Sequence, residues 1–423
     1  MDSVVMALTV FDDGGGPALY AGGGFSTAGD TTVNKIAKLQ GDQWLPLGTG
    51  IGAANGQVWV MGEFDDGTGP ALFVGGDFTV AGGQEVNHIA KWDGSTWSPV
   101  GQGTSATVRG AMTVFDDGSA PALYVGGDFI TAGGIEVNHV AKWDGEQWSA
   151  LGSGVSGEFH SVRALCVFDD GNGPALYAGG NFAVAGGIIV NGIAKWDGST
   201  WSAVGGGVGH GQPGSRLVRG LIVHNDGRGL ALYATGQFAS AGGVPAPGIA
   251  RWDGESWSAL GEGITSEPGS TPTGRRLVVF DDGSGPALYV GGTFTFAGGE
   301  TVNYIAKWDG TSWSSLESGL NDSVHAVVVF DEGDGPALFV GGGFTMAGDI
   351  PSVRIAKWAS ICVADFDGDG DGDIDLIDLQ AFVECLTGPV DSIGPDCAVF
   401  DENGDSHVDL YDFRGFQEAF TGP

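Results

Sequence analysis

Residues 167–205 read VFDDGNGPALYAGGNFAVAGGIIVNGIAKWDGSTWSAVG. The stretch contains four segments of strand length with β-branched or aromatic residues, and Asp-Gly or Gly-Gly pairs bound them. Asp169-Asp170-Gly171 is typical of a hairpin turn between the first two segments. The stretch therefore predicts a four-stranded antiparallel meander.

The same pattern recurs seven times along the chain. A Gly-Gly-x-Phe phrase, or a near variant, ends at phenylalanines spaced 50–56 residues apart, namely Phe25, Phe78, Phe129, Phe182, Phe238, Phe294 and Phe344. No segment before Ser360 shows a helical period over about 11 residues. A four-strand unit of about 50 residues has the size of a propeller blade. The sequence thus predicts an all-β, seven-bladed β-propeller over residues 1–360.

The seventh repeat is incomplete. It stops at Ala359-Ser360, without the Trp-Ser-x-Leu-Gly segment that ends the other repeats. Either the missing outer strand precedes residue 1 in a longer natural chain, or the last blade has three strands. Met1-Asp2-Ser3 leads directly into the first strand of the first repeat, which favours the longer chain.

Composition limits the classes of function. Eighty glycines stand beside 42% hydrophobic residues, so there is enough apolar surface for a packed core, and the glycine serves turns. A net charge of −35 excludes a nucleic-acid partner and suits calcium-rich extracellular surroundings. No stretch approaches the roughly 18 apolar residues of a membrane helix. We expect an extracellular or cell-surface protein.

The repeat pattern ends at Ser360, and residues 361–423 contain a second duplication. Residues 367–378 and 401–412 both match the 12-residue EF-hand loop, although Ser406 replaces the usual glycine in the second. Alternating oxygen ligands of this kind suit Ca²⁺. We expect two calcium ions, bound by Asp367, Asp369, Asp371, Asp373, Asp375 and Asp378 and by Asp401, Asn403, Asp405, His407, Asp409 and Asp412.

Apolar residues at helical spacing follow each loop, so we expect a small α-helical module around the calcium ions. Three of the four cysteines lie in this module, which fits a disulfide formed in an oxidising compartment. Cys362 and Cys397 precede the two loops at nearly equivalent positions. We therefore favour a Cys362–Cys397 disulfide over Cys385–Cys397.

Both parts of the chain resemble known families. The glycine pair, the aromatic-Asp turn and the Trp that opens the outer strand resemble the kelch repeat and the galactose oxidase propeller, which implies the fold more than an activity. Residues 361–423 resemble the dockerin family and the dockerin-like modules of secreted bacterial proteins, including those of planctomycetes. Position 12 of each loop is Asp rather than Glu, and both halves end in Thr-Gly-Pro. The resemblance implies calcium-dependent folding and docking, but the cysteines depart from the cellulosomal pattern and do not support a cohesin partner.

One basic position recurs in every repeat, at Lys38, Lys91, Lys142, Lys195, Arg251, Lys307 and Lys357. Because a ligand site breaks ring symmetry, this recurrence indicates a structural role, and we expect an ion pair or hydrogen bond between blades. The repeated Asp-Asp-Gly turns are interpreted in the same way, as hairpin chemistry.

Five basic residues near the start of the innermost strands do break the symmetry: Arg109, Arg163, Arg219, Arg275 and His325. The first two repeats carry Val5 and Val58 there. Innermost strands line the central channel, so we expect a basic arc at one mouth, where a sugar acid or another anion is one natural ligand. Alternatively, these side chains cap channel carbonyls and waters. Arg109 lies six residues before its Phe-Asp-Asp turn and the others five, so we expect it to point differently.

Two functions from different classes follow. The first is a secreted, non-enzymatic binding or structural protein, whose propeller presents a ligand-binding face and whose calcium module docks to an extracellular protein, the cell surface or a polysaccharide. The alternative is a carbohydrate-active enzyme, a polysaccharide hydrolase or lyase, with the same attachment module. No Gly-x-Ser-x-Gly or His-Glu-x-x-His motif occurs and no catalytic residue can be named. The near-identity of the repeats favours the binding protein.

Overall fold

The computed structural model describes residues 1–52, 56–157, 160–209, 217–267, 269–333 and 335–359. This part of the chain contains 45 strands and no helix, so the all-β prediction is confirmed for it, and no helix within it could span a membrane. The chain divides into two units, and residues 1–280 with 286–358 make up the first. The calcium loops, their expected helices and the three C-terminal cysteines lie outside the described residues.

Each repeat is built from the predicted meander of long strands. The first strands are β1 (Val5–Asp12), β8 (Val58–Asp65), β14 (Val108–Asp116), β21 (Ser161–Asp169), β28 (Leu217–Asn225), β35 (Gly274–Asp281) and β41 (Val324–Asp331). The second strands are β2 (Pro17–Gly23), β9 (Pro70–Gly76), β15 (Pro121–Gly127), β22 (Pro174–Asn181), β29 (Leu230–Gln237), β36 (Pro286–Gly292) and β42 (Pro336–Gly342).

The outer strands complete each sheet. The third strands are β5 (Ile36–Gln40), β12 (Ile89–Trp92), β18 (Val140–Trp143), β25 (Ile193–Trp196), β32 (Ile249–Trp252), β39 (Ile305–Trp308) and β45 (Ile355–Ala359). The fourth strands are β6 (Gln43–Pro46), β13 (Trp97–Pro99), β19 (Trp148–Ala150), β26 (Trp201–Ala203), β33 (Trp257–Ala259) and β40 (Trp313–Ser315).

Strand order follows the chain in every repeat, as in β1-β2-β5-β6. The fourth and fifth repeats share one eight-stranded sheet, because a single bridge between Asn181 and Leu217 joins β22 to β28. The last sheet, β41-β42-β45, has three strands within the described residues, and no strand from the start of the chain joins it.

Short hairpins, which were not predicted from the sequence, lie between the second and third strands of each repeat. They are β3 (Thr27–Ala28) with β4 (Thr31–Thr32), β10 (Val80–Ala81) with β11 (Gln84–Glu85), β16 (Thr131–Ala132) with β17 (Ile135–Glu136), β23 (Val184–Ala185) with β24 (Ile188–Ile189), β30 (Ser240–Ala241) with β31 (Val244–Pro245), β37 (Phe296–Ala297) with β38 (Glu300–Thr301) and β43 (Met346–Ala347) with β44 (Ile350–Pro351). Four of them pair with a strand that ends the preceding repeat, namely β7 (Ile51–Gly52), β20 (Val155–Ser156), β27 (Val208–Gly209) and β34 (Ile264–Thr265).

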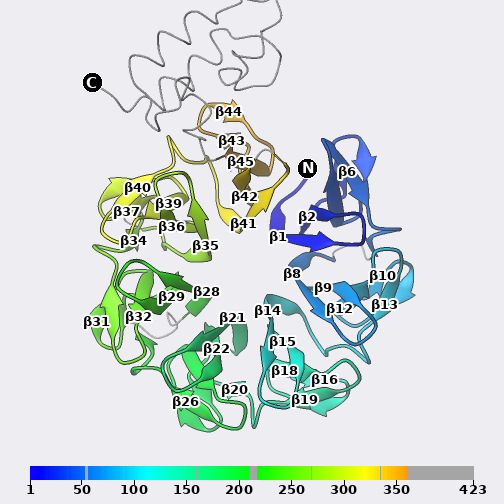
Figure 1. Ribbon diagram of the computed structural model, residues 1–423, viewed down its shortest axis with the longest axis horizontal. Coiled ribbons are helices and arrows are strands. Elements are labelled where there is room, and N and C mark those ends of the chain that lie inside the picture. Colours follow the sequence, from blue (N-terminus) through cyan, green and yellow to red (C-terminus); the bar gives the residue numbers. More distant parts are fainter. Residues whose placement is uncertain (53–55, 158–159, 210–216, 268, 334, 360–423) are drawn as a thin grey trace, which may run out of the picture. The chain divides into compact units, whose positions relative to one another are not determined.

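Within the first unit the sheets stand around a common centre, with the first strand of each repeat innermost (Figure 1). Strand β1 contacts both β8 and β41, so the first and last repeats are neighbours. The glycine pairs allow this packing. A Cβ built on Gly75 would lie 2.5 Å from Cγ1 of Val108 in the next repeat, and one on Gly341 would lie 2.6 Å from Cγ1 of Val5. The junction between the last and first repeats is therefore packed like the others.

A buried tryptophan provides a second link between repeats. Nε1 of Trp97 donates a hydrogen bond to the carbonyl oxygen of Leu47 in the preceding repeat, at 2.9 Å. The same bond recurs from Trp148, Trp201, Trp257 and Trp313. Each indole thus satisfies its buried N–H while it fills the space between two sheets.

Candidate functional site

The recurring basic position makes an ion pair with the first hairpin of the same repeat. Nζ of Lys38 lies 2.6 Å from Oδ2 of Asp13. Equivalent pairs are Lys91–Asp66, Lys142–Asp117, Lys195–Asp170, Arg251–Asp226 and Lys357–Glu332. The expected ion pair is confirmed, but its placement between blades was wrong. The third strand runs beside the second, so its basic side chain reaches the turn of its own sheet.

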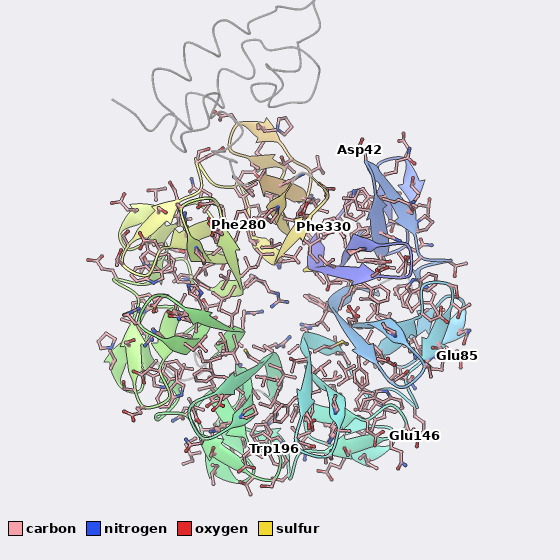
Figure 2. All side chains as sticks on the ribbon, viewed as in Figure 1. Asp42, Glu85, Glu146, Trp196, Phe280 and Phe330 are labelled. Atoms are coloured by element: carbon pink, nitrogen blue, oxygen red, sulfur yellow. The ribbon has the colours of Figure 1, made fainter. Side chains whose placement is uncertain are left out.

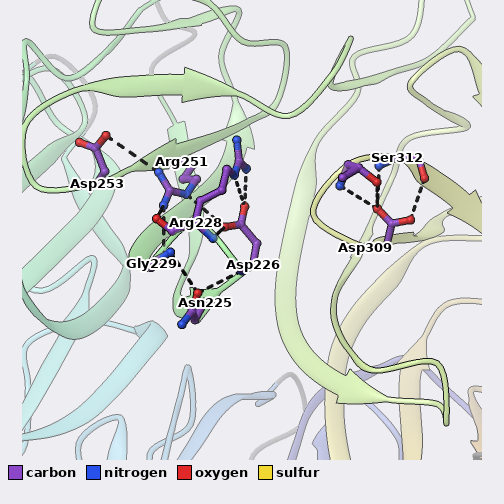
Figure 3. Close-up of polar contacts among 10 residues, drawn as sticks. Asn225, Asp226, Arg228, Gly229, Arg251, Asp253, Asp309 and Ser312 are labelled. Atoms are coloured by element: carbon purple, nitrogen blue, oxygen red, sulfur yellow. Dashed lines mark hydrogen bonds and ion pairs between the residues drawn. The ribbon is translucent and has the colours of Figure 1, made fainter.

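The Asp-Asp-Gly carboxylates are used within these turns. Oδ1 of Asp169 accepts hydrogen bonds from the backbone N–H groups of Gly171 and Gly173, both at 2.9 Å. In the fifth repeat Asn225 takes this role, and Arg251 lies between Asp226 and Asp253 (Figure 3). In the described part of the chain no three His, Cys, Asp or Glu side chains are grouped to hold a metal ion.

A different set of basic side chains converges at the centre of the first unit. They surround a cavity of about 180 Å³, which is lined by Met6, Trp59, Arg109, Gly110, Arg163, Arg219, Arg275, Arg276 and His325. All five residues of the expected basic arc are present, and Arg276 is an addition. Five of the ten arginines of the chain thus line one cavity in a protein of net charge −35.

β-Bulges place most of these side chains in the cavity. The pairing of the first with the second strand shifts register between Val162 and Ala164, around Arg163, and between Val218 and Gly220, around Arg219. The same shift occurs around Met6, Trp59 and His325. A bulge leaves one residue unpaired and redirects its side chain.

The bulges correct the sequence comparison for the first two repeats. The counterparts of the arginines are Met6 and Trp59, not Val5 and Val58. Both valines are fully buried, and both face a glycine of the preceding repeat. Met6 and Trp59 lie five residues before Phe11 and Phe64, so a consistent count from that phenylalanine would have found them.

The extra residue before the third turn does not remove Arg109 from the cavity. The register shift in β14 spans two residues, Arg109 and Gly110, and Gly110 has φ +113°. Glycine adopts this conformation without the penalty of a side chain. Cζ of Arg109 lies 4.3 Å from the centroid of the Trp59 ring, a cation–π contact. We expected Arg109 to point differently from the other four basic residues. This expectation was wrong, because Arg109 lines the same cavity.

Few negative charges balance the arginines. Among the described residues, Asp128 is the only carboxylate within ion-pair distance of the cavity arginines, at 3.1 Å from Nη2 of Arg163 and 3.6 Å from Nε of Arg109. By contrast, Asp42, Glu85 and Glu146 lie at the outer rim (Figure 2). The centre of the unit is thus cationic although the chain is strongly acidic.

Burial and mutual repulsion perturb the pKa values of these groups. Burial, and then the charges of Arg275 and Arg163, lower the pKa of Arg219 to about 9. Burial lowers the pKa of Arg276 to about 10, with a further contribution from Arg275. Burial and Arg275 lower the pKa of His325 to about 3. The five arginines of the cavity are therefore all positively charged at neutral pH and disfavour one another.

The alternative prediction, that these side chains only cap channel carbonyls and waters, holds for some of the basic residues and not for others. Nη1 of Arg276 donates to the carbonyl oxygens of Arg219 and Arg275, at 3.4 and 3.2 Å. The side chain of Arg219, however, makes no hydrogen bond or ion pair with any described residue, and Nε of Arg219 and Nε of Arg275 are buried without a partner there. A buried donor without a partner costs about 1–3 kcal/mol.

Comparison with known proteins bears on the fold alone. No family model and no curated protein matches the chain. The extracellular domain of a protein assigned to a one-component system of B. thetaiotaomicron is similar at a TM-score of 0.50 and 12% identity, over 88% of this chain and 41% of that chain. This chain therefore spans about two fifths of the length of that domain. A GH74 enzyme of Niastella koreensis matches at a TM-score of 0.35 and 14% identity, over 84% and 61% of the two chains.

Proposed function

We propose that residues 1–360 form a seven-bladed β-propeller with an incomplete last blade, and that this propeller is a non-enzymatic binding protein for an anion outside the cell. The sequential four-strand sheets, the inner position of their first strands and the neighbouring β1 and β41 support the architecture. The similar solved structure is an extracellular domain, which agrees with a place outside the cell.

A single observation supports anion binding: five arginines line one cavity, and only Asp128 balances them within the described residues. Buried charges are stable in proteins when they are paired. Guanidinium groups make strong, directional hydrogen bonds to oxyanions. An anionic ligand would supply the missing charge and the missing acceptors.

The residues that line this cavity do not favour the alternative function, a carbohydrate-active enzyme. Glycosidases use a pair of carboxyl groups about 5–10 Å apart across the scissile bond. None of the described residues that line this cavity is a carboxylate. The cavity is suited to hold a negatively charged group rather than to exchange protons with a sugar.

We extend the proposal to residues 361–423 on the basis of their sequence. This module would bind two calcium ions through the loops at 367–378 and 401–412 and would attach the propeller to a cell-surface protein or a polysaccharide. Propeller and module would then have separate tasks, the first in ligand capture and the second in anchoring.

The test of ligand capture compares binding with stability. Arg163→Ala combined with Arg219→Ala should weaken binding of sulfate, phosphate or an acidic polysaccharide at least tenfold, about 1.4 kcal/mol, and should leave the melting temperature unchanged or raise it. Arg228→Ala is the matched control, because Arg228 follows the opposite end of β28 and contacts Asp226 in the turn. A lowered melting temperature with no anion bound by the wild type would exclude the proposed function.

A further inference from the structure

Arg276 breaks the pattern of the inner strands more sharply than any other cavity residue. It lies four residues before Phe280, where the other six repeats have small residues, namely Ala7, Val60, Ala111, Ala164, Gly220 and Ala326. Adjacent Arg275 already occupies the position of the other arginines. The large side chain of Arg276 therefore enters a space that alanine, glycine or valine lines elsewhere in the ring.

Arg276 also marks the depth that a charged ligand can reach. It lines the basic cavity and a second cavity of about 190 Å³ further along the inner strands, and Arg219 lines both cavities as well. Each repeat contributes one apolar side chain to that second cavity: Leu8, Met61, Met112, Leu165, Leu221, Leu277 and Val327. Moving a charged group into apolar surroundings is costly. The anionic group would therefore stop beside Arg219 and Arg276.

The number of unbalanced charges indicates the charge of the ligand. Arg109 and Arg163 share Asp128. Arg219, Arg275 and Arg276 have no carboxylate partner among the described residues, and His325 accepts a hydrogen bond from Arg275 as a neutral ring. Five guanidinium groups and one carboxylate thus leave four positive charges in excess, and the three guanidinium groups from β28 and β35 have no carboxylate partner among the described residues.

We propose that the cavity binds a dianionic tetrahedral oxyanion, a phosphate monoester or the free inorganic ion, and that Arg276 contacts it at the inner end. This inference rests on the proposed function, because both require an anion in the cavity. A carboxylate has one charge and two coplanar oxygens, which one guanidinium fork satisfies. A phosphate has three or four oxygens in different directions and a charge near −2. Three guanidinium groups from two inner strands offer enough donors for the oxygens of the second group.

The size of the cavity limits what enters with the anion. The cavity has a volume of about 180 Å³. It has room for a phosphate group and a small part of its carrier. A phosphorylated end of a larger molecule, rather than the middle of a chain, suits this space.

Titration calorimetry of the full chain tests the ligand class. Inorganic phosphate, glucose 6-phosphate and sulfate should bind at least tenfold more tightly than glucuronate at equal ionic strength. Arg276→Gln should weaken phosphate binding at least tenfold and glucuronate binding little. Arg276→Lys keeps the charge without the fork and should lie between wild type and Arg276→Gln. Arg228→Gln, which removes one arginine outside the cavity, should change nothing.

The outcomes separate the two proposals. Glucuronate binding as tight as phosphate binding, weakened by Arg163→Ala with Arg219→Ala but not by Arg276→Gln, would overturn the tetrahedral ligand and keep anion capture. Absence of binding for all four anions would overturn both. If Arg276→Gln does not fold, equal phosphate affinities of Arg276→Lys and wild type would overturn the role of Arg276. Tighter binding of glucose 6-phosphate than of inorganic phosphate would support a monoester, and the reverse order the free ion.

Discussion

Nη1 of Arg275 lies 3.3 Å from Nδ1 of His325 in the next repeat. A guanidinium group only donates hydrogen bonds, so Nδ1 accepts, and the ring proton is assigned to Nε2. Nε2 lies 3.0 Å from the hydroxyl oxygen of Ser323, which completes the assignment. Burial and the arginine charges lower the pKa of His325 to about 3, so the ring is neutral at physiological pH.

This pair predicts that sulfate binding depends on pH. A dianion in the cavity offsets the arginine charges, and the pKa of His325 in the complex should rise above its value of about 3 in the free protein. At a pH between the pKa of His325 in the free protein and its pKa in the complex, the complex binds a proton that the free protein does not. Sulfate affinity should therefore increase as pH falls from about 7 towards about 4.5. Calorimetry in buffers of different ionisation enthalpy would measure the proton uptake.

His325→Gln is the control, since glutamine keeps a hydrogen-bond acceptor and does not titrate in this range. The variant should bind sulfate with an affinity that barely changes with pH. In the ligand-free protein the stability of the fold depends on pH in the opposite direction to sulfate affinity. The pKa of His325 is lower in the folded than in the unfolded state, so the unfolded state binds the extra proton. The free energy of unfolding therefore decreases as the pH is lowered from about 6.5 to about 3. Identical pH profiles for wild type and variant would contradict both expectations.

The sequence predicted most of what is local. Each four-strand unit and each Asp-Asp-Gly turn depends on residues close in the chain, and the described sheets match them. The basic arc was visible because it breaks a repeat that is otherwise regular. The structure brought its five members together at one cavity.

The misassigned residues depend on geometry between strands. A bulge exchanges which of two adjacent residues faces the cavity, so Val5 was taken in place of Met6. Arg276 was missed because its neighbour Arg275 already filled the repeated position.

One exchange of residue size involves two adjacent repeats. Thr235 occupies a position where the other second strands have glycine. Gly274, in the first strand of the next repeat, faces Thr235 and occupies a position where the other first strands have valine. The larger side chain therefore lies on the opposite side of this junction.

The tryptophan link between sheets should contribute measurably to stability. Trp148→Phe removes the hydrogen bond from Nε1 to the carbonyl oxygen of Val100, 3.2 Å long, and leaves that acceptor without its donor. We expect the free energy of unfolding to fall by about 1–3 kcal/mol, measured by urea denaturation. Trp44→Phe is a matched control, because the indole N–H of Trp44, at the same position in the first repeat, bonds to no described residue. Equal losses in the two variants would show that the hydrogen bond contributes nothing.

The Lys–Asp pair within each sheet should matter more where it is buried. Nζ of Lys142 lies 2.5 Å from Oδ2 of Asp117, which also accepts a hydrogen bond from the hydroxyl of Tyr124 at 2.8 Å. Burial acts to raise the pKa of Asp117, but the hydrogen bonds from Lys142, Ser119 and Tyr124 outweigh it and hold the pKa below its usual value. Lys142→Met should lower the free energy of unfolding by about 1–3 kcal/mol at neutral pH.

The loss should shrink on acidification, because stability from a depressed carboxyl pKa disappears as pH falls through that pKa. Lys357→Met is the comparison. Its pair with Glu332 is more exposed, 37% against 14% for the lysine side chain, so its removal should cost less than about 1 kcal/mol. Urea denaturation at neutral and acidic pH would measure the free energy of unfolding of both variants. An equal loss in the two would show that burial of the ion pair does not increase its contribution.

The cysteines predict a disulfide that thiol labelling can identify. After expression into an oxidising medium, Cys362 and Cys397 should resist alkylation until a reductant is added, and peptide mass spectrometry should recover them as one linked pair. Cys166 is an internal control, since burial raises the pKa of its thiol to about 12 and should make it slow to react in the folded chain. Three freely alkylated C-terminal thiols would exclude the disulfide and weaken the extracellular assignment.

Calcium should order the C-terminal module because sixteen acidic residues there face one basic residue, Arg414. Without a cation these carboxylates repel one another, and bound Ca²⁺ would offset the repulsion. Calorimetry of the full chain should show two calcium ions bound, and Asp367→Ala with Asp401→Ala, the first ligand of each loop, should abolish both. Asp365→Ala removes one carboxylate two residues before the first loop, outside the ligand register, and should retain two ions. Equal calcium binding by the double variant and by Asp365→Ala would mean that the loops act only as a diffuse acidic surface.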